Sequence, residues 1–255
     1  MRLVQIIFSP TGGTQKVADA MTEQWHDEVL NVDLSDARKD FSSVLLGNDD
    51  LAMIAVPSYG GRVPAIAAQR IKEIQGNGAR CVIVCVYGNR AYEDTLVELY
   101  DLAEQCHFRV IAAVSAIAEH SIVREYAAGR PDEADQQELV RFAETIFKKL
   151  SNNIAADSPL NIPGNRPYKS FGGVGLVPVA GETCTGCGQC AEHCPVLAIS
   201  REDSKIVDAR KCISCMRCVK ICPQSARKLK DEIVSAVTLA LKPVCSTRKK
   251  NELFL

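Results

Sequence analysis

The sequence lacks the features that would place the chain in a membrane or on a nucleic acid. No apolar run reaches the roughly 18 residues of a membrane span. The start of the chain, Met1–Pro10, lacks the long apolar core of a secretory signal. The formal net charge is −1, so the composition gives no support for a basic surface that binds nucleic acid or lipid. We therefore expect a cytoplasmic protein that has neither a nucleic acid nor a membrane as its partner.

Cysteine, in contrast, is abundant, with 12 residues in a chain of 255. In a reducing compartment, clustered cysteines are metal ligands or catalysts more often than disulfides. Eight of them form two runs of the pattern C-x2-C-x2-C-x3-C-P, and the second run begins 28 residues after the first: Cys184, Cys187, Cys190 and Cys194, then Cys212, Cys215, Cys218 and Cys222. This internal repeat predicts a small module with pseudo-twofold symmetry.

The spacing within each run is that of proteins that bind two 4Fe–4S clusters. Three thiolates lie on a loop around one cluster, and the fourth begins a helical turn that points to the other. We therefore assign one cluster to Cys184, Cys187, Cys190 and Cys222, and the second to Cys212, Cys215, Cys218 and Cys194. Structural zinc is the alternative, but it needs four thiolates per ion and leaves the third cysteine of each run unexplained. Residues 178–230 closely resemble bacterial-type ferredoxins, although they are basic where those proteins are usually acidic.

Short apolar stretches alternate with amphipathic ones over the first 150 residues. The expected strands are 3–8, 29–34, 51–56, 79–86 and 110–117, and the expected helices are 14–25, 64–74, 92–106 and 133–150. Apolar strands that alternate with helices predict a doubly wound parallel sheet with helices on both faces. The first 150 residues should therefore form an α/β domain.

A loop of small residues joins the first expected strand to the first helix, with the sequence Ser9-Pro10-Thr11-Gly12-Gly13-Thr14. Backbone N–H groups at the positive end of a helix bind phosphate. The spacing is neither that of Walker A nor that of the G-x-G-x-x-G dinucleotide motif. A phosphate site is therefore predicted, with an ordinary capped helix as the alternative.

The pattern S-x-T-G-x-T after the first strand resembles that of flavodoxins. This resemblance implies the strand order 2-1-3-4-5, with FMN at the switch point beyond strands one and three. It also implies that two later loops, 57–64 and 87–92, flank the flavin ring. The phosphate ligands would be Ser9, Thr11, Gly12, Gly13 and Thr14, and the ring contacts Pro57, Ser58, Tyr59, Gly60, Gly61, Gly88, Asn89, Arg90 and Tyr92. Ordinary loop packing is the alternative for Tyr59 and Tyr92, and it is favoured for His120, which follows the fifth strand.

The chain divides into four expected segments: an FMN-binding domain at 1–150, a linker rich in proline and glycine at 151–177, a small α+β ferredoxin-like domain at 178–230, and a tail at 231–255. The tail should hold a short helix over 232–241 and then a basic, frayed end. The whole chain resembles the flavodoxin–ferredoxin fusion proteins of anaerobes. Residues 1–150 carry a net charge of −7 and residues 178–230 a net charge of +4. The two domains could attract each other, or the basic one could bind a redox partner protein with an acidic docking face.

Three functions fit these features. The first is an electron-transfer iron–sulfur flavoprotein that relays electrons between FMN, two 4Fe–4S clusters and external redox partners. The second is a flavin-dependent reductase of a small-molecule acceptor, and the third is a redox sensor in which the clusters are structural. The sequence contains no nucleophile–base constellation and no open catalytic metal site, which favours the first. A homodimer is compatible with all three.

Overall fold

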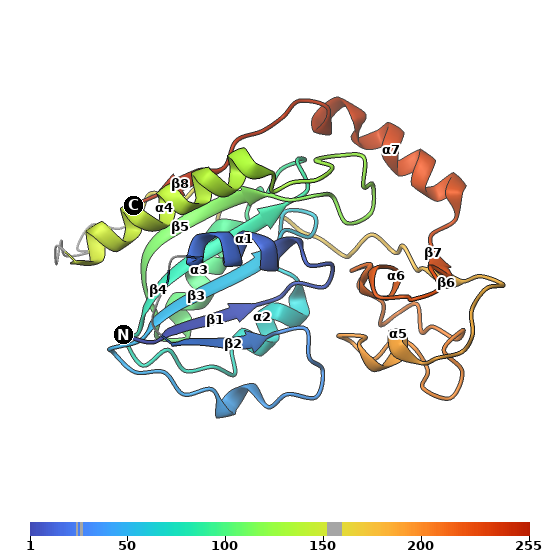
Figure 1. Ribbon diagram of the computed structural model, residues 1–255, viewed down its shortest axis with the longest axis horizontal. Coiled ribbons are helices and arrows are strands. Elements are labelled where there is room, and N and C mark those ends of the chain that lie inside the picture. Colours follow the sequence, from blue (N-terminus) through green and yellow to red (C-terminus); the bar gives the residue numbers. More distant parts are fainter. Residues whose placement is uncertain (24, 26–27, 152–159) are drawn as a thin grey trace.

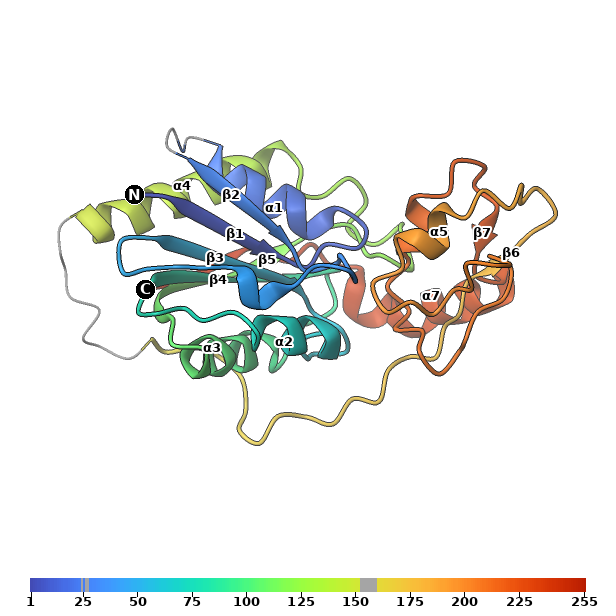
Figure 2. The same cartoon turned by 90° about the horizontal axis from the view of Figure 1, so that it is seen from below.

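The computed structural model describes residues 1–23, 25, 28–151 and 160–255. An α/β domain occupies one side of the molecule, and a small domain that contains the two cysteine runs lies beyond the carboxyl ends of its strands (Figure 1). The C-terminal segment leaves the small domain and returns to the α/β domain (Figures 1 and 2). The chain therefore crosses between the domains twice.

The α/β domain is built on a sheet in which five strands run parallel. In chain order these are β1 (Leu3–Ile7), β2 (Val29–Asp33), β3 (Leu51–Pro57), β4 (Arg80–Tyr87) and β5 (Arg109–Ile117). Their spatial order is β2-β1-β3-β4-β5, which confirms the predicted flavodoxin-like topology. Leu3 lies opposite Val29 on one side and Leu51 on the other, so β1 is central and β2 is an edge strand. The switch point of this order lies between β1 and β3.

Helices cover both faces of the sheet, as predicted. The helices are α1 (Gly13–Thr22), α2 (Ala65–Ile71), α3 (Thr95–Gln105) and α4 (Glu133–Ser151), with a 3-10 turn at Phe41–Ser43. Alternate residues of a strand point to opposite faces, so Val4 packs with α2 and α3 while Leu3 packs with α1 and α4. None of the helices described is long and apolar enough to cross a membrane.

The C-terminal tail differs from the prediction. Its helix, α7, runs over Asp231–Cys245, and a further strand, β8 (Glu252–Phe254), pairs antiparallel with β5. The expectation of a frayed end is therefore wrong. The Oδ1 atom of Asn251 accepts a hydrogen bond from Ile117 N–H at 3.0 Å, and the Glu252 carboxylate accepts one from the Ser115 hydroxyl at 2.9 Å. The pairing of β8 with β5 extends the sheet by one strand, and these polar contacts hold the added strand in place.

The linker is partly attached to the α/β domain. Its first residues, 152–159, lie outside those described, and residues 160–176, which we call the linker strap, run along α3. The Asp94 carboxylate accepts hydrogen bonds from the backbone N–H groups of Asn165 at 2.8 Å and Lys169 at 2.7 Å. Arg166 forms a two-bond ion pair with Asp101 at 2.6 and 2.7 Å. The strap therefore has a defined course towards the carboxyl ends of the strands.

The small domain contains short elements only. They are β6 (Val179–Ala180), α5 (Gln189–Glu192), α6 (Arg217–Lys220) and β7 (Arg227–Lys228), with β6 and β7 antiparallel. The residues before α5 and α6, Gly188 and Met216, are 28 positions apart and both are left-handed, with φ of 75° and 60°. The backbone thus repeats along with the cysteines, and the α+β class is confirmed.

The two domains contact each other through a buried arginine. The guanidinium of Arg70, on α2, donates to the backbone oxygen of Leu34 and to that of Pro195, each at 2.6 Å. Arg70 is only 7% exposed although it carries a charge. Pro195 directly follows Cys194, the last cysteine of the first run, so this contact fixes the end of that run relative to the sheet.

Candidate cofactor sites

The loop between β1 and α1 has the geometry of an anion site. Gly12 precedes the helix in a left-handed conformation, with φ of 90°, and as a glycine it offers no side chain to cap the helix. The N–H of Gln15 is held by the Ser9 hydroxyl at 2.9 Å. Among the described residues, the N–H groups of Gly12, Gly13 and Thr14 donate to no protein acceptor. Free N–H groups at a helix N-terminus fit a phosphate group.

A cavity of about 560 Å³ lies beside this loop, at the carboxyl ends of β3 and β4. A smaller cavity of about 70 Å³ connects the phosphate loop to the same walls. The volume of the larger cavity is typical of cofactor sites. We call the larger space the flavin-ring cavity. Its lining includes Tyr59, Gly60, Gly88, Arg90, His120, Phe171, Ile213 and Ser214.

The structure brings most of the predicted flavin-binding residues to these cavities. Thr11, Gly13, Thr14 and Pro57 line the smaller cavity, Gly60 and Arg90 line the larger one, and Ser58, Tyr59 and Gly88 line both. The Ser58 hydroxyl lies 2.8 Å from that of Thr95, and the Tyr59 ring packs edge-on against Phe8. Tyr59 therefore packs against a buried residue and also lines both cavities.

Two predicted ring contacts have side chains that point elsewhere. The Asn89 amide donates to the backbone oxygens of Cys245 at 2.7 Å and Thr247 at 2.8 Å. The Tyr92 hydroxyl donates to Glu252 at 2.9 Å. Both side chains therefore hold the C-terminal tail. Gly61 faces Glu93, because a Cβ atom added there would lie 1.9 Å from its carboxylate.

His120 forms part of the cavity wall in a defined protonation state. Its Nδ1 accepts hydrogen bonds from the N–H groups of Ile122 at 3.2 Å and Val123 at 3.0 Å, which leaves the proton on Nε2. Burial, and to a smaller extent the positive charge of Arg90, lowers the pKa of His120 to about 4. Gly88 is required here, since a Cβ atom added to it would lie 2.5 Å from His120 Cδ2. His120 is thus a neutral donor beside the predicted ring site.

Arg90 supplies positive charge to the same cavity. Its guanidinium forms two hydrogen bonds to Glu93, at 3.1 and 2.9 Å. Its backbone oxygen accepts a hydrogen bond from the Lys249 ammonium. The ion pair fixes the side chain, which lines the flavin-ring cavity.

Sequence reasoning missed the residues that close the cavity from outside the α/β domain. Phe171, Val174 and Leu176 come from the linker strap, and Val237 and Leu241 come from α7. The signal in the sequence was Phe171, an aromatic residue next to Gly172-Gly173 in a linker rich in proline and glycine. That pattern says nothing about where the ring lies.

One predicted set of cluster ligands is gathered in the structure. Cys194, Cys212, Cys215 and Cys218 line a common cavity in the small domain. Burial raises the pKa of Cys215 to about 12, and the nearby thiols of Cys218, Cys194 and Cys212 contribute to that shift. Four close thiols in an apolar site fit a 4Fe–4S cluster, which binds them as thiolates.

The cysteines of the other set range from exposed to buried. Cys187 is exposed and Cys190 is buried. The Sγ atom of Cys222 accepts the N–H of Ala226 at 3.3 Å, which matches the bond from Ala198 N–H to Cys194 at 3.3 Å in the other repeat. Among the described residues, no three His, Cys, Asp or Glu side chains converge as they would on a single metal ion. The two ligand sets therefore remain sequence-based predictions.

The cavity for the flavin ring and the second cysteine set share a wall. Ile213 and Ser214, which lie between Cys212 and Cys215, line the flavin-ring cavity. The Ser214 hydroxyl accepts the N–H of Leu176 at 3.0 Å, which ties the strap to this loop. A cofactor ring and a cluster at these two sites would be neighbours.

Comparison with known proteins finds a family match in the cysteine-rich segment. The family model of the 4Fe-4S dicluster domain matches residues 183–227. No curated protein matches the chain in sequence. Solved structures that are similar to it include flavodoxin 1 from Bacillus cereus, with 15% identity over 58% of this chain and 98% of that one and a TM-score of 0.43.

Two further structures match the same part of the chain. A flavodoxin from Megasphaera elsdenii has 14% identity over 57% of this chain and 99% of that one, with a TM-score of 0.37. Rubredoxin oxygen:oxidoreductase from Desulfovibrio gigas has 17% identity over 60% of this chain but only 37% of that one, with a TM-score of 0.44. The chain thus joins an α/β domain with the flavodoxin strand order to a segment that matches the 4Fe-4S dicluster domain.

Proposed function

We propose that the chain is an electron-transfer iron–sulfur flavoprotein that relays electrons between FMN, two 4Fe–4S clusters and external redox partner proteins. FMN would be held by the loop over Ser9–Thr14, and the clusters by the two interleaved cysteine sets. When bound, FMN exchanges one or two electrons and each cluster exchanges one, so two clusters match one two-electron exchange. The protein itself supplies binding, orientation and electrostatics.

The proposal rests on the wall that the flavin-ring cavity shares with the second cysteine set. Ile213 and Ser214 belong to the cysteine loop and also line the flavin-ring cavity. A separate sensor or carrier domain would not need its ligand loop in this position. The arrangement supports a relay in which the second cysteine set, with Cys194, is the one next to the ring.

The cavity residues fit the binding of a ring that changes charge. Tyr59 and Phe171 contribute aromatic surface that excludes water. His120 offers a proton donor on Nε2 without carrying a positive charge, and Arg90 supplies the positive charge. A fixed donor and a fixed cation tune the electronics of a flavin.

The outer cysteine set fits contact with a partner. Cys187 and its neighbours Thr185 and Gly186 are exposed, whereas Cys215 in the other set is buried. Exposure close to a cluster permits approach by another protein. Because residues 178–230 carry a net charge of +4, the partner would present an acidic docking face.

Light-driven reduction tests the relay. The protein is reconstituted anaerobically with iron, sulfide and FMN, and illuminated in the presence of EDTA, which reduces flavin photochemically. We expect the visible absorption of the clusters to bleach and a reduced-cluster signal to appear in electron paramagnetic resonance. The same protein loaded with clusters but not FMN should keep its clusters oxidised under the same light.

Two results would count against the proposal. The first is folded, cluster-loaded protein that binds no FMN. The second is a bound flavin that is fully reduced by light while the clusters stay oxidised, although dithionite reduces them. Iron analysis provides the stoichiometry, with about eight irons per chain expected from two four-iron clusters.

A further inference from the structure

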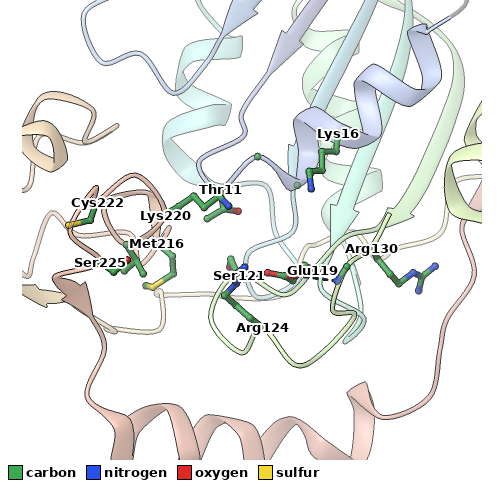
Figure 3. Close-up of a pocket in the computed structure, with 14 residues that line it drawn as sticks. Thr11, Lys16, Glu119, Ser121, Arg124, Arg130, Met216, Lys220, Cys222 and Ser225 are labelled. Carbon is green, nitrogen blue, oxygen red and sulfur yellow. Dashed lines mark hydrogen bonds and ion pairs between the residues drawn. The ribbon is translucent and has the colours of Figure 1, made fainter. Parts of the chain in front are cut away.

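A second cleft opens between the two domains, beside the loop that joins β1 to α1 (Figure 3). Its volume is about 350 Å³. The α/β domain contributes Thr11, Gly12, Gly13 and Lys16 to it, and the small domain contributes Lys220 at the end of α6. We call this space the interdomain cleft.

The loop between β1 and α1 (Ser9–Thr14), which we call the phosphate loop, borders both this cleft and the smaller cavity. Thr11 and Gly13 line the two spaces alike. A phosphate group bound by the free N–H groups of Gly12 and Gly13 would therefore face the interdomain cleft. The small domain closes the other side of that cleft, so its side chains are available to the same phosphate.

The cleft is lined by more positive than negative charge. Arg124 is paired with Glu119 at 2.5 Å, and Arg130 with the buried Asp135 at 2.5 Å, so both arginines already have a carboxylate partner. Lys16 and Lys220 make no ion pair within the described part of the chain. Lys220 also lies close enough for its charge to help lower the pKa of Glu119. Two lysines, one from each domain, are thus unneutralised beside the loop.

We propose that Lys220 of the small domain, together with Lys16 of α1, binds the phosphate of the flavin in the interdomain cleft. This inference rests on the proposed function, because it takes FMN as the ligand of the loop. It adds that the flavin is held by both domains. Flavin binding and the docking of the small domain would then strengthen each other, and FMN would be selected over riboflavin, which has no phosphate.

Titration of the two flavins tests this. Cluster-loaded protein without flavin is titrated anaerobically with FMN and, separately, with riboflavin, and binding is followed by the quenching of flavin fluorescence. For Lys220→Gln we expect FMN to bind about tenfold more weakly, which corresponds to about 1.4 kcal/mol, and riboflavin to bind as in the wild type. Lys16→Gln should act in the same direction.

The matched control is Lys228→Gln. Lys228 lies in the same domain, is exposed, and is paired with the exposed Asp231 at 3.5 Å. This substitution removes the same charge from the domain but not from the cleft, so FMN affinity should stay at the wild-type value. The FMN affinity of the Lys220→Gln protein should also depend less on salt than that of the wild type.

Several results would overturn the inference. One is equal FMN affinity in the wild type and in Lys220→Gln, and another is a loss that is the same for riboflavin. A third is inorganic phosphate that binds to FMN-loaded wild type but not to FMN-loaded Lys220→Gln, because the cleft would then hold a separate anion. Wild-type protein that binds neither flavin would instead refute the proposed function itself.

Discussion

A Cβ atom added to Gly60 would lie 2.1 Å from Cε2 of Phe171, so the Phe171 ring packs directly on the Gly60 backbone. Gly60 follows β3, whereas Phe171 belongs to the linker strap, 111 positions later in the chain. Both residues line the flavin-ring cavity. The strap thus delivers an aromatic side chain to a site that the α/β domain leaves open.

Replacement of Phe171 by alanine should weaken FMN binding about fivefold, because aromatic contacts contribute about 1 kcal/mol beyond the area they bury. Fluorescence titration measures the affinity. Val174→Ala is the control, since Val174 lies on the same strap and lines the same cavity but offers no ring. If both variants bind FMN equally well, the Phe171 ring does not contact the cofactor.

The interleaved cysteine sets predict a specific loss of iron. Cys194→Ser should remove the cluster of Cys212, Cys215 and Cys218, and iron should fall from about eight to about four per chain. Cys106→Ser is the control, because Cys106 is buried in the α/β domain and its thiol contacts the Ile71 backbone oxygen at 3.5 Å. Iron analysis after anaerobic reconstitution gives the count. Full iron content in Cys194→Ser would contradict the ligand assignment.

Asn89 should affect stability rather than flavin binding. Its buried amide makes three hydrogen bonds to the tail, two as donor to Cys245 and Thr247 and one as acceptor from Lys249 N–H at 3.1 Å. Asn89→Ala should lower the free energy of unfolding by about 2 to 4 kcal/mol in urea denaturation. Asn77→Ala corrects for the left-handed backbone, since Asn77 has φ of 48°, is exposed, and donates one amide hydrogen bond, to the Leu46 backbone oxygen at 3.0 Å. A large loss of FMN affinity in Asn89→Ala with unchanged stability would restore the predicted ring contact.

Local patterns were sufficient to predict the five parallel strands and the four helices of the α/β domain. Strand β4 (Arg80–Tyr87) is buried on both faces after its first residue, and its continuous apolar sequence predicts this directly. The phosphate loop was also predictable, since its short hydroxyl residues and glycines lie between a strand and a helix. In these segments, each residue and its near neighbours in the sequence are sufficient to predict the local structure.

Contacts between distant segments could not be predicted in the same way. Strand β8 has three residues and pairs with β5 through Phe254 opposite Ala113, a separation that no local pattern encodes. The prediction placed the side chain of Tyr92 at the flavin. The sequence does not show that the C-terminal tail returns to the α/β domain, where Glu252 accepts a hydrogen bond from the Tyr92 hydroxyl. Likewise, nothing in the linker sequence indicates that Asp94 holds its backbone.

His120 should make stability depend on pH between about 4 and 6.5. Its pKa is about 4 in the folded protein, below the ordinary value of 6.5, because the ring is buried. As pH falls below 6.5 the unfolded chain takes up a proton that the folded chain does not, so stability falls with falling pH. Between pH 7 and pH 5 this loss should be about 1 to 2 kcal/mol. Urea denaturation at the two pH values should show a smaller loss for His120→Gln.

The control for this effect is His107→Asn. His107 is exposed and left-handed, with φ of 62°, a conformation that asparagine accepts readily. Its replacement should leave the difference between pH 7 and pH 5 unchanged. An identical pH dependence in His120→Gln and the wild type would show that His120 is not the group responsible.

The contact of Arg70 with Pro195 should determine how the domains are held together. Arg70→Met removes both guanidinium bonds and leaves the Leu34 and Pro195 carbonyls without this donor, which costs about 1 to 3 kcal/mol for each buried group left unpaired. We expect the radius of gyration in small-angle X-ray scattering to increase, and cluster reduction in the light experiment to become slower, while FMN and iron contents stay unchanged. Arg38→Gln removes the exposed pair with Glu192 at 3.3 Å and should change neither quantity, because such pairs contribute little. Wild-type scattering and transfer rates in Arg70→Met would mean that other contacts hold the domains.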